Sequence, residues 1–318
     1  MIADIWAIGI DLGATKAGIA QVDCLGNIHK KVKVPTGNSK SAEEVIADIS
    51  EAIKGLINEH SLPPVGIGVG IAGQIDPEII LVHNAPNLEW QNFPIGKELK
   101  SHLHLPVAIS NDVHAATRGE WMFGAGHGCK DLVCVFVGTG IGGGIVSHGK
   151  MLAGHSNTIG EVGHMTVNFN GPTCACGNTG CLEAYAGGAS LGKRAEEALL
   201  ETPDEVLKKL SEGNKITGKM VQEAAEQGSK VAQQVLDQAL EALISGSVSI
   251  VNALNPQLLI FGGGVIEGMP SFVQSIRRGV EDRALKAATV DLEIKRGKLH
   301  NDAGIIGSAA LAIEKFGS

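Results

Sequence analysis

Asp11-Leu12-Gly13-Ala14-Thr15-Lys16 joins two apolar segments, residues 5–11 and 18–23, and predicts two strands connected by a glycine turn. A carboxylate ends the first strand, and the turn exposes backbone N–H groups beside a hydroxyl and an ammonium group. Such a turn can hold terminal phosphates while the carboxylate holds hydrated Mg²⁺. The alternative interpretation is an ordinary hairpin in which glycine adopts a positive φ.

A second glycine turn, Gly138-Thr139-Gly140-Ile141-Gly142-Gly143-Gly144, follows an apolar run at residues 132–137. Two of its glycines repeat the spacing of Gly13 and Gly18, so we expect a duplicated fold with one glycine hairpin in each half. The turn also matches the dinucleotide fingerprint G-x-G-x-x-G, but that fingerprint needs a helix directly after the glycines. Ile145-Val146 continues as a strand instead, and the backbone could still wrap a phosphate.

Other elements follow from periodicity and from stop signals. Ser41 and Glu44 form a capping-box pattern at the start of a helix. A long apolar-rich helix should end at Asn255-Pro256. We further expect strands at residues 65–71, 106–110 and 258–261, a helix from residue 112 towards 123, and a final helix over residues 304–316.

Asn111-Asp112 lies where a strand should meet a helix. An Asp at a helix N-terminus is commonly the N-cap. The alternative is a general base that accepts a proton from an attacking hydroxyl group. Gly262-Gly263-Gly264 also follows a strand, and it is either a tight turn or a place where the backbone passes close beneath an adenine.

One His and three Cys fall within 18 residues, in the sequences Glu161-Val162-Gly163-His164 and Cys174-Ala175-Cys176-Gly177-Asn178-Thr179-Gly180-Cys181-Leu182-Glu183. This ligand set suits a closed, tetrahedral, structural Zn²⁺ site, and free core thiols are the alternative. A metal-braced loop would fix the orientation of Glu161 and Glu183. Carboxylates fixed in this way suit a ligand with many hydroxyl groups.

Taken together, and in this order along nearly the whole chain, these segments resemble the ROK family of repressors, open reading frames and kinases. Within the family they are most similar to the bacterial glucokinases, and Asn87-Leu88-Glu89-Trp90 adds to this resemblance. The resemblance implies an α/β protein with the actin-like ATPase (ribonuclease H-like) fold and a cleft between two domains. We expect residues 1–114 and 300–318 to form the smaller domain, and residues 115–299 to form the larger one with the zinc site.

The resemblance also implies ATP, Mg²⁺ and a structural Zn²⁺, with Asp112 as the catalytic base. It implies sugar contacts from Gly73, Asn87, Asn111, Asp112, Glu161, His164 and Glu183. It implies nucleotide contacts from Asp11, Gly13, Thr15, Lys16, Gly138, Thr139, Gly140 and Gly262–Gly264, and zinc ligands at His164, Cys174, Cys176 and Cys181. The run Asn111-Asp112-Val113-His114 departs from the family's usual Asn-Asp-Ala-Asn, which leaves the sugar preference open.

Composition narrows the classes of partner. The net charge is -8 and there is no basic block, which argues against nucleic-acid binding. Met1–Trp6 lacks the pattern of a signal peptide, and no apolar run is long enough to span a membrane. Cysteines in one metal-like cluster favour a reducing, cytoplasmic compartment over a disulfide scaffold. We expect a homodimer or homotetramer, as is common in the family.

Three alternatives to a glucokinase stay open. A kinase for N-acetylglucosamine, N-acetylmannosamine, fructose or allose would use the same polar ligands. A sugar-responsive repressor is a more distant alternative, since the first strand begins within ten residues and we expect no helix-turn-helix before it. A dinucleotide-dependent oxidoreductase is disfavoured because a strand follows the second glycine turn.

Overall fold

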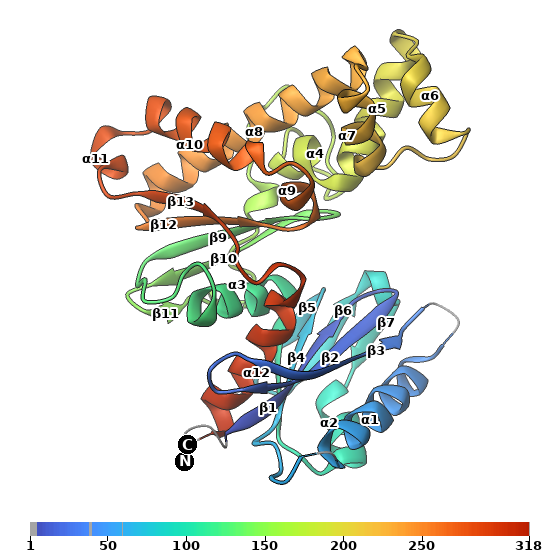
Figure 1. Ribbon diagram of the computed structural model, residues 1–318, viewed down its shortest axis with the longest axis vertical. Helices are drawn as coiled ribbons and strands as arrows, with labels where there is room; N and C mark the ends of the chain where they lie inside the picture. Colours follow the sequence, from blue (N-terminus) through green and yellow to red (C-terminus); the bar gives the residue numbers. More distant parts are fainter. Residues whose placement is uncertain (1–4, 38–39, 59, 318) are drawn as a thin grey trace. The chain divides into compact units, whose positions relative to one another are not determined.

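The computed structural model describes residues 5–37, 40–58 and 60–317 of the 318-residue chain. Residues 1–4, which are part of the Met1–Trp6 segment predicted not to be a signal peptide, lie outside the described residues. The chain packs into two compact units, whose elements are labelled in Figure 1. Within the described residues, unit 1 contains the chain up to Gly128, residues 151–159 and the chain from Asn301 onwards; unit 2 contains residues 129–150 and 160–300.

Unit 1 is built on a five-stranded sheet with the order β3-β2-β1-β4-β8. The strands are β1 (Trp6–Leu12), β2 (Lys16–Asp23), β3 (Ile28–Pro35), β4 (Ile67–Ile71) and β8 (Val107–Asn111). β1 is antiparallel to β2 and parallel to β4, and β4 is parallel to β8. The carboxyl ends of β1, β4 and β8 therefore meet at one edge of the sheet.

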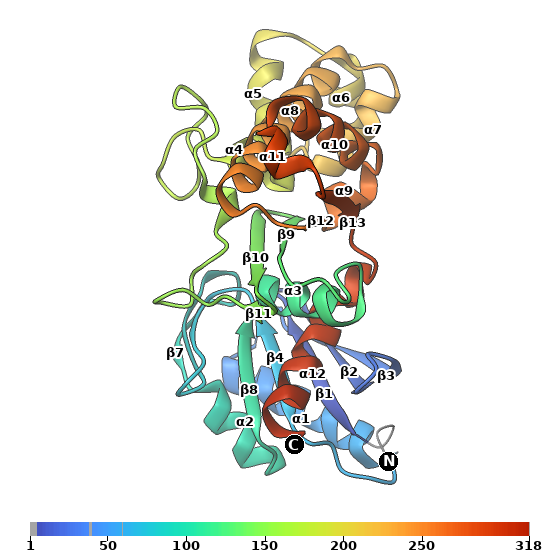
Figure 2. The same cartoon turned by 90° about the vertical axis from the view of Figure 1, so that its left-hand side faces the viewer.

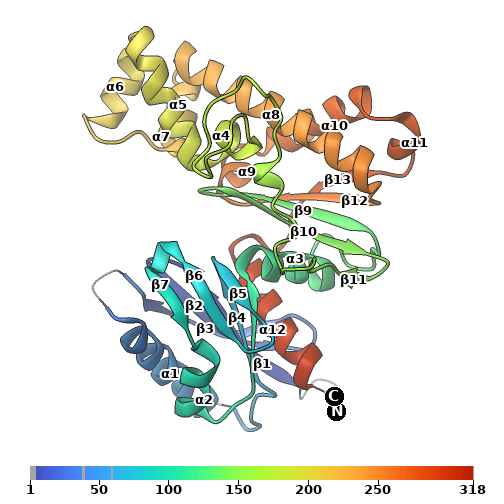
Figure 3. The same cartoon turned by 180° about the vertical axis from the view of Figure 1, so that it is seen from behind.

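Helices cover both faces of this sheet. α1 (Ala42–Asn58) and α2 (Ile95–Leu103) lie side by side on one face (Figure 3), where the core includes Ile10 of β1. α3 (Asp112–Phe123) and α12 (Ala303–Phe316) pack on the other face. Glycine allows that close packing, since a Cβ at Gly68 would lie 1.7 Å from the carbonyl oxygen of Ser308.

Unit 2 repeats the sheet of unit 1. Its order is β11-β10-β9-β12-β13, with strands β9 (Leu132–Val137), β10 (Ile141–Ser147), β11 (Lys150–Met151), β12 (Leu258–Gly262) and β13 (Glu293–Arg296). β9 is antiparallel to β10 and parallel to β12, and β12 is parallel to β13. The duplicated fold predicted from the two glycine turns is thereby confirmed, and a strand rather than a helix follows the G-x-G-x-x-G sequence.

The helices of unit 2 gather on one side of its sheet (Figure 2). They are α4 (Leu182–Ala186), α5 (Gly188–Glu201), α6 (Glu205–Ser211), α7 (Gly218–Glu226), α8 (Lys230–Leu254), α9 (Gly264–Gly268), α10 (Ser271–Arg283) and α11 (Lys286–Thr289). The long helix α8 packs against α4, α5, α7 and α10. It ends where predicted, because Asn255 adopts a left-handed conformation and Pro256 follows.

Several local predictions are also confirmed. The capping box forms, with the Ser41 N–H donating to Glu44 and the Glu44 N–H donating to Ser41. The structure adds a small sheet of β5 (Gln74–Asp76), β6 (Leu81–Ala85) and β7 (Trp90–Phe93), which we did not predict. The domain boundary expected after residue 114 would cut α3 in two, whereas the compact units keep α3 whole within unit 1. None of the helices in the described part of the chain has the length and apolar character needed to cross a bilayer.

Candidate functional site

Asp11 lies near the carboxyl end of β1, in a partly buried position beside a second carboxylate. Burial and the charge of Asp112 raise the pKa of Asp11 to about 6, although Lys31 and Lys16 act in the opposite direction. A Cβ at Gly304, in the first turn of α12, would lie 3.2 Å from Cγ of Asp11. A divalent cation would relieve the cost of holding these carboxylates ionised, so the pair fits Mg²⁺.

The first glycine turn forms the predicted hairpin, but Gly13 is not needed there for a positive φ. Its N–H donates to the carbonyl oxygen of Lys16 at 3.2 Å, and a Cβ on it would lie equally close to that oxygen. The buried Thr36, which directly follows β3, holds the turn, since its Oγ1 donates to the Gly13 carbonyl at 2.7 Å. Within the described residues no acceptor pairs with the N–H groups of Ala14 and Thr15, so both could receive phosphate oxygens.

Asn111, not Asp112, is the N-cap of α3. The side-chain oxygen of Asn111 accepts from the N–H of Val113 at 2.9 Å and from the N–H of His114 at 3.3 Å. Asp112 is the first residue of the helix proper, so the helix start does not require its carboxylate as a cap. The capping interpretation of Asp112 is wrong, and the general-base interpretation remains a prediction. With its oxygen engaged, Asn111 keeps its amide N–H groups as donors for a ligand.

His114 has a defined partner. Its Nε2 lies 2.7 Å from the carbonyl oxygen of Ile159, to which it can donate a hydrogen bond. The bond ties the first turn of α3 to the segment of residues 151–159, which belongs to the same unit. His114, which stands where the family usually has Asn, therefore makes a contact within unit 1.

Gly73 and Asn87 lie at the small sheet of unit 1. Gly73 follows β4 closely, and a Cβ there would lie 2.5 Å from the carbonyl oxygen of Asn84 in β6. Asn87 lies in the 3-10 turn η2 (Pro86–Leu88) and is exposed. Close packing against the backbone of β6 thus explains why residue 73 is a glycine. The side-chain amide of Asn87 is accessible to a ligand.

The second glycine turn, Gly138–Gly140, lies against the beginnings of two helices. The carbonyl oxygens of Gly138 and Thr139 accept from the N–H groups of Gly188 at 2.8 Å and Ala189 at 3.0 Å. Glu183 of α4 accepts from the N–H of Ile141 at 2.7 Å. The turn, α4 and α5 therefore form one hydrogen-bonded assembly within unit 2.

The third glycine sequence is a tight strand-to-helix turn. Gly263 has φ +89°, and a Cβ there would lie 2.5 Å from the carbonyl oxygen of Val137, the last residue of β9. Gly264, the first residue of α9, has open space where a Cβ would lie. Gly263 is thus explained by packing, while contact of Gly262–Gly264 with a nucleotide remains a prediction.

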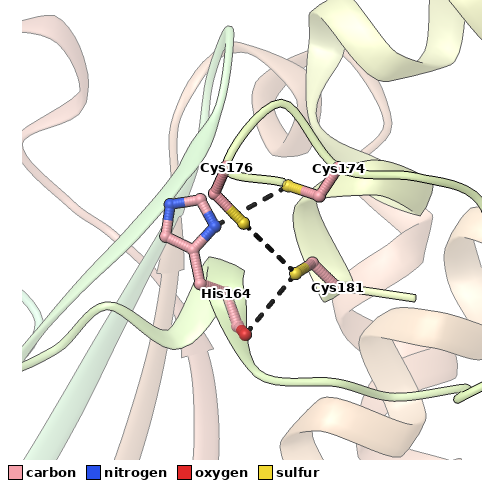
Figure 4. A group of neighbouring side chains, drawn as sticks. All are labelled: His164, Cys174, Cys176 and Cys181. Carbon is pink, nitrogen blue, oxygen red and sulfur yellow. Dashed lines mark hydrogen bonds between the residues drawn. The ribbon is translucent and has the colours of Figure 1, made fainter. Parts of the chain in front are cut away.

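His164, Cys174, Cys176 and Cys181 come together as predicted, with ligand atoms within 4.8 Å of one another. Figure 4 shows His164 Nδ1 turned towards Cys174, at 3.8 Å, and the Cys176 and Cys181 sulfurs 3.7 Å apart. A tetrahedral zinc site with bonds of about 2.0–2.3 Å has edges of about 3.3–3.8 Å. The donor set and these two distances therefore fit Zn²⁺.

The thiols of this cluster have unequal environments. Hydrogen bonds from Asn178 and Cys174 lower the pKa of the exposed Cys176, whereas burial and hydrogen bonding to Cys176 raise the pKa of Cys181 to about 11. A buried thiol with a raised pKa resists ionisation unless a cation compensates it. The other ring nitrogen of His164, Nε2, lies 4.0 Å from a carboxylate oxygen of Glu161. The two residues of Glu-x-Gly-His are therefore neighbours across one 3-10 turn.

Some residues that support the first glycine turn and Asp11 were not predicted from the sequence. Thr36 holds the first turn from 23 residues away, and Lys31 is one of the cations facing Asp11 while it also pairs with Asp302. Gly304 lies beside Asp11 although the two are almost 300 positions apart. No local pattern marks these residues, because only the pairing of β2 with β3 and the packing of α12 on β1 bring them there.

Comparison with known proteins places these features in one family. The ROK family pattern matches residues 7–315. A glucokinase of Thermotoga maritima is 35% identical over 312 residues, covering 98% of both chains. A ROK family glucokinase from Streptomyces griseus, solved in complex with glucose and AMPPNP, has 33% identity and a TM-score of 0.81, covering 97% of this chain and 99% of that one. A xylose repressor of Caldicellulosiruptor bescii is 31% identical, with 96% of this chain aligned to 77% of the repressor.

Proposed function

The chain belongs to the ROK family and has its two-domain, actin-like ATPase fold, and from this premise we propose that it is an ATP-dependent glucokinase. The reaction is transfer of the γ-phosphoryl group of ATP to the 6-hydroxyl of glucose. The observation that carries the proposal is the carboxylate of Asp112 at the start of α3, beside Asp11, with the capping task taken by Asn111. Full-length similarity to glucokinases supports the choice of sugar.

Asp112 would act as the general base. It accepts the proton of the 6-hydroxyl as that oxygen attacks the γ-phosphorus, and ADP leaves with the electrons of the broken P–O bond. Asn111 orients the start of α3 by capping it, so that the base is held on a rigid helix rather than on a loop. Asp11 would hold Mg²⁺, which supplies positive charge to the phosphates when bound.

The two glycine turns would hold the phosphates. In unit 1 these are Gly13, Thr15 and Lys16, whose turn offers backbone N–H groups and one ammonium group. In unit 2 they are Gly138, Thr139 and Gly140, with Gly262–Gly264 near the base and ribose. N–H groups fixed by the surrounding backbone stabilise developing phosphoryl charge without having to reorganise during the reaction.

The proposed sugar ligands are Gly73, Asn87, Asn111, Asp112, Glu161, His164 and Glu183. His164, Cys174, Cys176 and Cys181 would hold a structural Zn²⁺. With Nδ1 on the side of the thiols, His164 keeps Nε2 for a sugar hydroxyl.

The decisive test compares Asp112→Asn with the wild-type protein in an ADP-release assay with glucose and MgATP. We expect turnover to fall at least about 10²-fold because a general base is removed, while glucose binding measured by calorimetry persists. Asp204→Asn is the matched control, since Asp204 caps α6 and Asn caps equally well. Near-normal turnover of Asp112→Asn would refute the assignment of the base.

A substrate panel tests the sugar itself. Glucose should give the highest kcat/KM among glucose, mannose, fructose, allose, N-acetylglucosamine and N-acetylmannosamine. A higher value for another sugar would keep the chemistry and change the substrate. Sugar binding without any turnover of ATP would instead favour a sugar-responsive repressor, the function of the related C. bescii protein.

We further propose a cytoplasmic enzyme with no nucleic-acid partner, assembled as a homodimer or homotetramer. The net charge of -8 and the thiol-rich cluster support the first two points. Light scattering on a sizing column would measure the assembly.

A further inference from the structure

Glu183 has a structural contact beyond its proposed role as a sugar ligand. It belongs to the first turn of α4, and its Oε2 accepts from the N–H of Ile141 at 2.7 Å. A Cβ at Gly140 would lie 2.4 Å from the same oxygen. Glycine at position 140 is therefore what allows the carboxylate to reach the second glycine turn.

The turn is held at three neighbouring points. Gly188 and Ala189 donate to the carbonyl oxygens of Gly138 and Thr139, and Glu183 accepts from the N–H that follows the turn. In the part of the chain that the structure describes, the N–H groups of Thr139 and Gly140 have no acceptor. These are the donors that a phosphate requires, and their direction depends on the peptide planes that the three bonds fix.

We propose that Glu183 is a positioning residue for the phosphate-binding turn, in addition to its role at the sugar; this inference rests on the proposed function. The two carboxylate oxygens of Glu183 have different roles. Oε2 holds the turn, while no donor within the described residues reaches Oε1, which is available to a sugar hydroxyl. One half-buried side chain thereby joins the sugar and phosphate parts of unit 2.

The two roles make different predictions about nucleotide binding. A residue that only binds sugar contributes nothing to nucleotide affinity when sugar is absent. A residue that positions the turn contributes in the absence of sugar, because a loosened turn must be ordered when the phosphates bind. The ionised carboxylate also repels phosphate, so a test must separate loss of the hydrogen bond from loss of the charge.

Glu183→Gln and Glu183→Met make that separation. Both remove the charge and keep the side-chain length, but only Gln retains an oxygen that can accept from the Ile141 N–H. The measurement is the Kd of Mg-AMPPNP by calorimetry without sugar. We expect the Met variant to bind about five-fold or more weakly than the Gln variant, as for the loss of one hydrogen bond, and Gln to restore binding to the wild-type level or better.

Glu196→Gln is the matched control, because Glu196 is another half-buried carboxylate of unit 2 that accepts a backbone N–H, that of Ile216 at 2.8 Å. It should leave the Kd unchanged. Equal Kd values for the Met and Gln variants would overturn the inference, and Glu183→Ala replaces Met if the latter does not fold. Failure of the wild type to phosphorylate any sugar, with the Met–Gln difference intact, would reject the proposed function alone. Failure of the wild type to bind AMPPNP would reject both.

Discussion

Replacement of Asp11 by Asn should stabilise the ligand-free protein at neutral pH, although it removes a residue proposed to hold Mg²⁺. The pKa of Asp11 is raised from 3.8 to about 6 by burial and by Asp112. Between these two values the folded protein binds the proton more tightly than the unfolded chain does. Stability therefore falls as the pH rises from 3.8 through 6, and the full cost is present above pH 6.

The size of that cost follows from the same values. A difference of about two pH units corresponds to about 3 kcal/mol, which is an upper figure for the gain on neutralising the side chain. Each kcal/mol raises the melting temperature of a domain of this size by about 2–4 °C. Asn keeps the shape of the side chain, so the gain should not be offset by a cavity.

The assay is thermal unfolding of wild type and Asp11→Asn in EDTA, from pH 4 to pH 8. The variant should melt several degrees higher at pH 7.5, and the difference should vanish towards pH 4. Asp23→Asn is a control of opposite sign: burial opposes ionisation of Asp23, but hydrogen bonds from Asn27, His29 and Leu25 outweigh it and lower the pKa. That variant should lose stability at pH 7.5. An Asp11→Asn protein no more stable than wild type at pH 7.5 would refute the reasoning.

Cys176→Ala removes one of four proposed zinc ligands. The zinc content, measured by elemental analysis, should fall from about one per chain to near zero, and the melting temperature should fall as well. An unchanged zinc content would contradict the proposed zinc site. Gly263→Ala should cost more than about 1 kcal/mol in denaturant unfolding, because φ is +89° and the new Cβ would meet the carbonyl oxygen of Val137 at 2.5 Å. Gly264→Ala, with open space at its Cβ, should be close to neutral, and equal effects of the two variants would argue against the packing explanation.

Local chemistry made several features predictable. The strand-turn-strand units, the capping box of α1 and the stop at Asn255-Pro256 depend on residues that are neighbours in sequence, and each is confirmed. The zinc-like cluster was predictable for the same reason, since all four residues fall within 18 positions. The glycine spacing of the two turns predicted a duplicated fold, and the structure adds that the two sheets have corresponding strand orders.

The capping question shows where local reasoning fails. Asn111 and Asp112 are both good N-cap residues, and sequence patterns cannot say which of two neighbours lies at the boundary. The choice depends on where β8 stops pairing with β4, which is a property of the sheet. Once Asn111 pairs with Ile71, it becomes the N-cap and Asp112 enters the helix.

The sequence by itself determined the strand-turn-strand units, the duplication and the ligand set of the Cys–His cluster, because short-range dihedral preferences and spacing encode them. Only the tertiary structure decided that Asn111 caps α3, that burial and Asp112 raise the pKa of Asp11, and that Glu183 holds the turn at Ile141. The physical reason is that hydrogen-bond partners and desolvation depend on distances between residues far apart in the chain. Those distances are set by the pairing of strands and by the close packing of helices against glycines in the sheet.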